Sequence, residues 1–112
     1  MDNLKTVKFF EEVLSKTKDG KIRWQPTAVD NHFITALGGH FTLSLSQYTD
    51  EAQDFEYALV LKDQEGRILV RVASLDDSIE FRGLSELYET ARRQALQVDD
   101  KIDQVLGELS KL

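Results

Sequence analysis

The sequence predicts a single α+β domain with an N-terminal helix, an antiparallel meander of four or five strands, and a long C-terminal helix. Three patterns support this prediction. Apolar residues recur every three or four positions over residues 1–19, they alternate with polar residues over 21–74, and a heptad seam runs through 84–112. The predicted strands follow one another through short turns, which is typical of an antiparallel meander and not of βαβ crossovers.

The N-terminal segment, residues 1–19, predicts an amphipathic helix that ends at Gly20. Its apolar stripe consists of Leu4, Val7, Phe10 and Leu14, widened by Phe9 and Val13. Cations at Lys16 and Lys18 suit the C-terminal end of a helix. The polar face mixes both signs of charge, so we expect a helix packed on the domain's own core and not one lying on a membrane.

The next segments predict the first strands of the sheet. Ile22 and Trp24 alternate with polar residues, which indicates a half-buried strand ended by Pro26. Residues 32–37 form a short apolar strand. Gly38 and Gly39 predict a two-residue turn after it, which would set residue 37 opposite residue 40.

A second hairpin is predicted beyond an acidic loop at residues 49–54. Alternation over residues 55–61, a turn at 63–66 and alternation over 68–72 define its two strands. A period of two leaves each strand one apolar side. We therefore expect one buried face, formed by Phe41, Leu43, Leu45, Leu59, Leu61, Ile68 and Val70.

The C-terminal segment carries apolar residues at alternating spacings of four and three. They are Leu84, Tyr88, Ala91, Ala95, Val98, Ile102, Val105, Leu109 and Leu112. A continuous helix over 84–112 would be about 44 Å long. Strands of five to eight residues span only about 17–26 Å, so part of this helix would overhang the sheet.

Two arrangements could cover the overhanging half. The helix could break near residues 98–100 and fold back, or a second copy of the chain could cover it. Residues 97–101 contain no Gly, Pro or Asn, which favours the second copy. The predicted dimer interface consists of Val98, Ile102, Val105 and Leu109. The flanking charges are mixed in sign and allow either helix orientation: Arg92, Asp99, Lys101 and Glu108.

The composition is that of an ordinary globular domain. Hydrophobic residues make up 41% and charged residues 30% of 112 residues, which suits one core and excludes a disordered chain. The chain has no cysteine, so disulfides and thiolate chemistry are excluded. It has neither a signal-peptide pattern at its start nor an apolar run of about 20 residues. We expect a cytoplasmic protein without membrane partners.

The net charge of −6 is concentrated in the second half. Residues 49–112 carry fifteen acidic and eight basic residues, against five and six in residues 1–48. Duplex binding requires clustered cations that neutralise phosphates. The sequence has no such cluster, which argues against nucleic acid as a partner.

Two runs of residues and one short strand resemble those of a group of small uncharacterised bacterial and phage proteins. The runs are residues 20–24, Gly-Lys-Ile-Arg-Trp, at the first strand, and residues 84–106 of the C-terminal helix, and the short strand is the one that leads into Gly38-Gly39. The most specific part of the second run is Tyr88-x-x-Ala91-Arg92-Arg93-x-Ala95, followed by Val98-Asp99 and Ile102-Asp103. The resemblance covers most of the chain and implies a prokaryotic or viral source. It implies no activity, cofactor or catalytic residue.

The sequence carries no motif for catalysis or metal binding. His32 and His40 lie on opposite arms of the first hairpin and far apart along it, with only Asp30 nearby, so no ligand set for a metal forms. Adjacent carboxylates such as Asp99 and Asp100 are typically solvated. Gly38-Gly39 lacks the further glycines and the helix of a phosphate loop. We expect a protein that is not an enzyme and that uses no cofactor.

Four residues are candidates for binding an anionic ligand. Arg92 and Arg93 lie beside Tyr88 on the predicted helix, and Arg can clamp phosphate or stack on a base. Trp24 could stack on a ligand in the same way. The alternatives are that both arginines pair with nearby carboxylates and that Trp24 anchors the core or an interface.

The leading hypothesis is a non-catalytic interaction or adaptor module that acts as a homodimer, for instance in phage–host conflict. The alternative is a binding protein that sequesters a small anion such as a signalling nucleotide. A hydrolase without a readable motif ranks third. Convergence of Arg92, Arg93, Tyr88 and Trp24 on one groove would favour the anion binder. An apolar surface patch, with the arginines tied to carboxylates, would favour the adaptor.

Overall fold

The computed structural model describes residues 3–49, 55–73 and 83–112. Its elements are α1 (Asn3–Lys18), β1 (Gln25–Pro26), β2 (His32–Leu37), β3 (Phe41–Thr49), β4 (Phe55–Asp63), β5 (Ile68–Ala73), α2 (Leu84–Ala95) and α3 (Val98–Leu109). All neighbouring strands pair antiparallel in the order β1-β2-β3-β4-β5. The predicted α+β class and antiparallel meander are confirmed.

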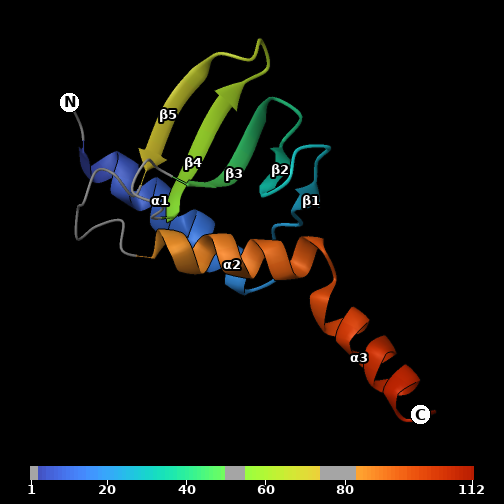
Figure 1. The fold of residues 1–112 in the computed structure, drawn as a ribbon. Helices are drawn as coiled ribbons and strands as arrows, with labels where there is room; N and C mark the ends of the chain where they lie inside the picture. Colours follow the sequence, from blue (N-terminus) through green and yellow to red (C-terminus); the bar gives the residue numbers. More distant parts are fainter. Residues whose placement is uncertain (1–2, 50–54, 74–82) are drawn as a thin grey trace.

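Two helices cover one face of this sheet, and the third projects from the rest of the domain. We call the sheet together with α1 and α2 the body. Figure 1 shows α1 and α2 side by side across the sheet, near the end where β4 begins, while α3 projects away from them. The molecule measures 59 × 37 × 25 Å along its principal axes. Its long dimension reflects the projecting helix.

The core lies between the sheet and the pair α1 and α2. Leu43 and Leu45 of β3 and Leu59 of β4, which lies opposite Leu45, are fully buried, as the alternating patterns of these strands predict. The helices and the segment before β1 complete this core with Phe10, Val13, Ile22, Trp24, Leu84, Leu87, Tyr88 and Ala91. The expectation that the N-terminal helix packs on the domain's own core is therefore confirmed.

The predicted buried face is wrong at two positions. Phe41 lies at the start of β3 and is 43% exposed, and Ile68 is 59% exposed. A register shift between Leu61 and Lys62 sets Val70 opposite Leu61 but Ile68 opposite Lys62. Since side chains alternate across a strand, this bulge moves Ile68 to the other face of the sheet.

The first strand and the first turn also differ from the prediction. Ile22 and Trp24 are buried but precede β1, which contains only Gln25 and Pro26 at the edge of the sheet. Leu37 pairs with Phe41 and not with residue 40, so the turn has three residues, 38–40. Gly38 and Gly39 both adopt positive φ angles there. Of the acidic loop predicted at 49–54, Thr49 ends β3 and the rest lies outside the described residues.

The C-terminal segment is two helices and not one. α2 ends at Ala95, α3 begins at Val98, and Gln97 between them has a left-handed backbone with φ 54° and ψ 47°. The predicted continuous helix over 84–112 is therefore wrong. The fold-back that was its alternative is not observed either, because α3 points away from the body (Figure 1).

Candidate interaction surface

The heptad seam divides at the corner between α2 and α3. In α2 the seam residues Leu84, Tyr88 and Ala91 are buried against the domain's own core. In α3 no residue is buried, and all of residues 99–112 are exposed. The apolar stripe of α3 is therefore the part of the seam that the domain does not use.

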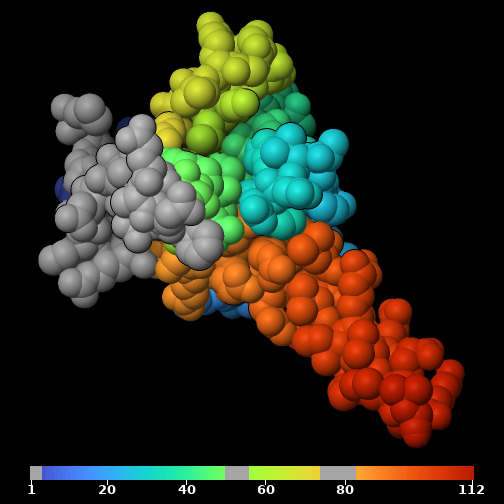
Figure 2. All heavy atoms as spheres, viewed as in Figure 1, coloured from blue at the N-terminus to red at the C-terminus, as the bar shows by residue number. Residues whose placement is uncertain are grey.

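The predicted interface residues lie together on this stripe. Ile102, Val105 and Leu109 are 46%, 56% and 55% exposed, and Val98 at the start of the helix is partly buried. Leu106, which the prediction did not include, is 57% exposed and widens the stripe. Figure 2 shows α3 standing clear of the body along most of its length.

A shallow apolar groove runs along the stripe. It has a volume of about 360 Å³ and is lined by Leu96, Val98, Lys101, Ile102, Val105 and Leu106. Its walls are almost entirely carbon, with Lys101 as the one charged residue among them. Such a groove suits an apolar side-chain row from another helix better than it suits a charged ligand.

The corner that aims α3 outward is built from local contacts. The amide of Leu96 donates to the carbonyl of Arg92 at 2.9 Å, and the amide of Gln97 donates to the carbonyl of Gln94 at 3.2 Å, so two of the last carbonyls of α2 are satisfied locally. The Arg93 guanidinium then donates to the carboxylate of Asp99 in the first turn of α3. These contacts join the two helices in a bent arrangement.

The four candidate anion-binding residues do not meet in one groove. Arg92 pairs with Glu89 at 3.2 Å, and Arg93 pairs with Asp99. Trp24 and Tyr88 are each only 1% exposed. Both arginines are tied to carboxylates, and both aromatic rings belong to the core.

Partners inside the core hold the two buried aromatic rings. The Trp24 indole Nε1 donates to Thr17 Oγ1 at 3.1 Å. The Tyr88 ring packs against Phe33 and Tyr57, with ring centroids 5.8 and 5.3 Å away. Burial raises the pKa of the Tyr88 phenol, and the nearby Arg92 opposes that shift only in part.

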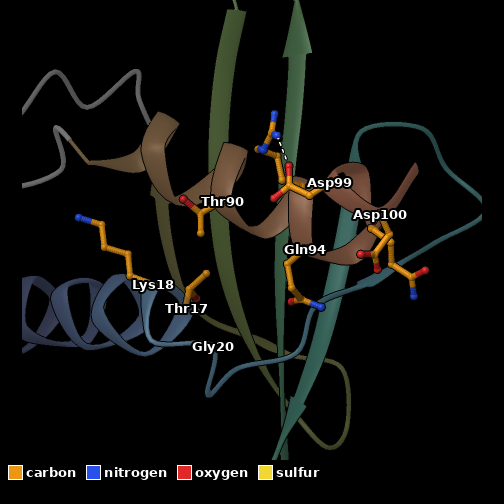
Figure 3. Close-up of a pocket in the computed structure, with 9 residues that line it drawn as sticks. Thr17, Lys18, Gly20, Thr90, Gln94, Asp99 and Asp100 are labelled. Carbon is orange, nitrogen blue, oxygen red and sulfur yellow. Dashed lines mark hydrogen bonds and ion pairs between the residues drawn. The ribbon is translucent and has the colours of Figure 1, made fainter. Parts of the chain in front are cut away.

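A polar hollow of about 500 Å³ opens between the end of α1 and the α2–α3 corner. Figure 3 shows Thr17 and Lys18 of α1 on one side of it, with Thr90 and Gln94 of α2 opposite and Asp99 and Asp100 at its rim. Its cations are already engaged, since Lys18 pairs with Glu86 at 2.7 Å and Arg93 with Asp99. The hollow therefore offers an incoming anion no unpaired arginine.

Neither metal chemistry nor a membrane span is evident in the part of the chain that the structure describes. Across 3–49, 55–73 and 83–112, no three His, Asp or Glu side chains gather as metal ligands. His40 instead lies 3.3 Å from the side-chain oxygen of Gln64 through its Nδ1. Within the same ranges, every helix is too short or too polar to cross a lipid bilayer.

Comparisons of the chain with protein-family models, with curated proteins and with solved structures found no match.

Proposed function

We propose that this protein is a non-catalytic interaction module that acts as a homodimer and associates through the apolar stripe of α3. The observation that carries the proposal is the exposure of four large apolar side chains on one side of a projecting helix: Ile102, Val105, Leu106 and Leu109. A contiguous apolar patch on an otherwise charged surface is typical of a protein–protein contact.

A partner on the stripe would lower the free energy of both the apolar side chains and the helix that carries them. Each of these side chains is about half exposed, so full burial would contribute about 1 kcal/mol apiece. α3 has twelve residues, and an isolated helix of this length is marginal in water. A partner on the stripe would stabilise the helix and remove its apolar side chains from solvent together.

The state of the arginines supports the adaptor over the anion binder. A phosphate site needs guanidinium groups free to form charge-assisted hydrogen bonds. Here Arg92 and Arg93 each have a carboxylate partner, and Trp24 and Tyr88 are inaccessible to a ligand. A role in phage–host conflict stays a prediction that rests on the resemblance alone.

The proposal is tested by sedimentation velocity on the full chain over tens to hundreds of micromolar. The wild type should approach twice the 12.8 kDa chain mass as concentration rises. Ile102→Asp places a charge in the centre of the stripe and should remain monomeric. Gln104→Asp adds the same charge to another side of α3 and should associate like the wild type.

Two outcomes would overturn the proposal. A wild type that stays monomeric at the highest concentration would show that no second copy covers α3. A wild type and an Ile102→Asp variant that associate equally would place the contact on another surface. Circular dichroism of each variant distinguishes loss of association from loss of folding.

A further inference from the structure

We infer that the two copies of α3 pack antiparallel, in the register that sets Ile102 opposite Val105 of the partner subunit and Val98 opposite Leu109 of the partner subunit. This inference rests on the proposed function, because it specifies how the same surface meets a second copy. Three features of α3 carry it: the spacing of its apolar residues, the position of its charges and the location of the body at one end.

The apolar spacing reads the same in both directions along the helix. Val98, Ile102, Val105 and Leu109 are separated by four, three and four residues. When a second α3 runs the opposite way, each of these side chains meets a large apolar side chain at the same level. The antiparallel pair therefore forms four apolar layers. Val98 with Leu109 of the partner subunit makes one kind of layer, Ile102 with Val105 of the partner subunit makes the other, and the two-fold symmetry produces each kind twice.

The structure narrows the flanking charges, because Arg92 lies on α2 and pairs with Glu89 while Asp99 pairs with Arg93. The two that remain complement each other only in the antiparallel direction. Lys101 and Glu108 lie on the same edge of the stripe, two helical turns apart. In the antiparallel register Lys101 faces Glu108 of the partner subunit, and the reverse pair forms by symmetry. Glu108 also lies 3.5 Å from Lys111, but that pair is highly exposed at both ends and is weak.

A parallel pair would be electrostatically worse. It would place Lys101 beside the partner's Leu106, leaving that lysine without an opposite charge. It would also bring the acidic first turns of both helices, each with Asp99 and Asp100, to the same end. Like charges at the same end repel, and two parallel helix dipoles add to that repulsion.

The body of each chain gives a steric reason for the same choice. Packed helices lie about 8–10 Å apart, whereas the molecule is 25 Å across even in its narrowest direction. Both bodies attach at the N-terminal end of α3, where the corner at Gln97 fixes them (Figure 1). A parallel pair would crowd them together, and an antiparallel pair places them at opposite ends of a rod about 18 Å long.

The expected complex is a reversible one. Two twelve-residue helices bury less than the about 800 Å² per partner of a standard interface. The dimer should therefore dissociate at accessible concentrations, with a Kd in the micromolar range. It would hold two identical bodies facing apart, which suits a module that bridges two copies of the same partner.

Orientation is tested with single-cysteine chains, because the native chain has no cysteine. Val98→Cys and Leu109→Cys chains, one bearing a mass tag, are mixed in a glutathione redox buffer and separated without reductant. The antiparallel pair predicts mainly the mixed Val98→Cys with Leu109→Cys disulfide. Two homodisulfides in place of the mixed product would overturn the inference and indicate a parallel pair.

Charge reversal provides a second readout that needs no cross-link. Lys101→Glu and Glu108→Lys should each weaken association about fivefold to tenfold, since each replaces two attractive pairs by two repulsive ones. The double variant should recover most of the loss. Additive weakening in the double variant would overturn the antiparallel register.

Failure of the inference differs from failure of the proposed function. If the wild type is a dimer by sedimentation but forms homodisulfides, or is not rescued by the double variant, the orientation is wrong and the dimer stands. If the wild type is a monomer and the mixed single-cysteine chains form no disulfide, both are wrong.

Discussion

The side-chain amide of Gln94 makes hydrogen bonds with both backbone groups of Trp24. The Trp24 amide donates to Gln94 Oε1 at 2.7 Å, and Gln94 Nε2 donates to the Trp24 carbonyl at 3.4 Å. Gln94 thus takes the place of a neighbouring strand for the residue just before β1. It also ties the last turn of α2, just before the α2–α3 corner, to the segment that leads into β1.

Removing this amide should destabilise the body. Gln94→Ala leaves the Trp24 amide without its partner, and we expect the free energy of unfolding to fall by about 1–3 kcal/mol. Gln94→Glu keeps the acceptor but loses the donor, so it should fall between Gln94→Ala and the wild type. Urea titration followed by Trp24 fluorescence measures all three. Equal stability of Gln94→Ala and the wild type would show that water replaces the amide without cost.

The buried pair Thr17 and Trp24 gives a second stability prediction. Thr17 is 5% exposed, and its Oγ1 accepts the indole hydrogen bond. Thr17→Val keeps the shape but leaves that donor unsatisfied, which should cost about 1–3 kcal/mol. Thr17→Ser keeps the acceptor, so its free energy of unfolding should fall clearly less. If Thr17→Val were the more stable of the two, the bond would not contribute to folding.

Tyr88 should make the protein sensitive to alkali. Burial holds its folded-state pKa above the unfolded value of about 10. A raised folded pKa contributes stability that is fully present below the unfolded pKa and is lost as pH rises through the folded pKa. Between pH 9 and 11, approximately, unfolding free energy should fall less steeply in Tyr88→Phe than in the wild type.

Tyr48 provides the matched control for this pH series, because it is an exposed tyrosine on β3. Tyr48→Phe removes a phenol from the surface and not from the core, so it controls for the loss of a tyrosine side chain as such. Identical slopes for Tyr88→Phe and the wild type would mean that another group causes the alkaline loss. Chemical denaturation at each pH supplies the measurement.

The left-handed backbone at Gln97 predicts which of two substitutions there gives the more stable protein. A left-handed backbone favours glycine and penalises β-branched residues. Gln97→Gly should therefore be more stable than Gln97→Val by about 1 kcal/mol or more. In a continuous helix the order would reverse, because glycine is the poorer helix former. Thermal and urea unfolding of the two variants distinguish the broken helix from the continuous one.

The elements with strong local patterns could be predicted from the sequence. The strand predicted at 32–37 coincides with β2, and the alternation of Phe41, Leu43 and Leu45 identifies β3. The first helix follows from its apolar stripe and from Gly20, which has a positive φ angle just after α1. The local periodicity identifies each element and most of its buried residues, such as Phe10 and Leu43, but not the exposure at the element ends, where Leu4 is 81% and Phe41 is 43% exposed.

The sequence-based predictions failed where tertiary contacts or an unusual backbone conformation determine the structure. The bulge between Leu61 and Lys62 reverses Ile68, yet its residues have no glycine or other sign of irregularity. The corner uses Gln97 in a left-handed conformation, although Gly and Asn are the usual residues there. The bonds of Gln94 to Trp24 join positions 70 residues apart, so no local pattern could indicate them.

The sequence predicted which apolar residues of the candidate surface the domain itself does not bury. It did not predict the bend between α2 and α3 that turns them into solvent. The heptad spacing identifies Val98, Ile102, Val105 and Leu109. In the structure these four residues lie on a separate helix, α3. Leu106 was missed because it lies one position outside the strict seam. Its exposure next to Ile102 and Val105 shows that the stripe is wider than a two-position heptad.

The claim that a second copy covers α3 is tested most directly by hydrogen–deuterium exchange of its backbone amides. Wild type and Ile102→Asp are compared at the same concentration of several hundred micromolar. We predict exchange at residues 102–109 at least about tenfold slower in the wild type, with α2 unchanged between the two. Equally fast exchange of residues 102–109 in both proteins would contradict the account, because α3 would then stand uncovered in solution.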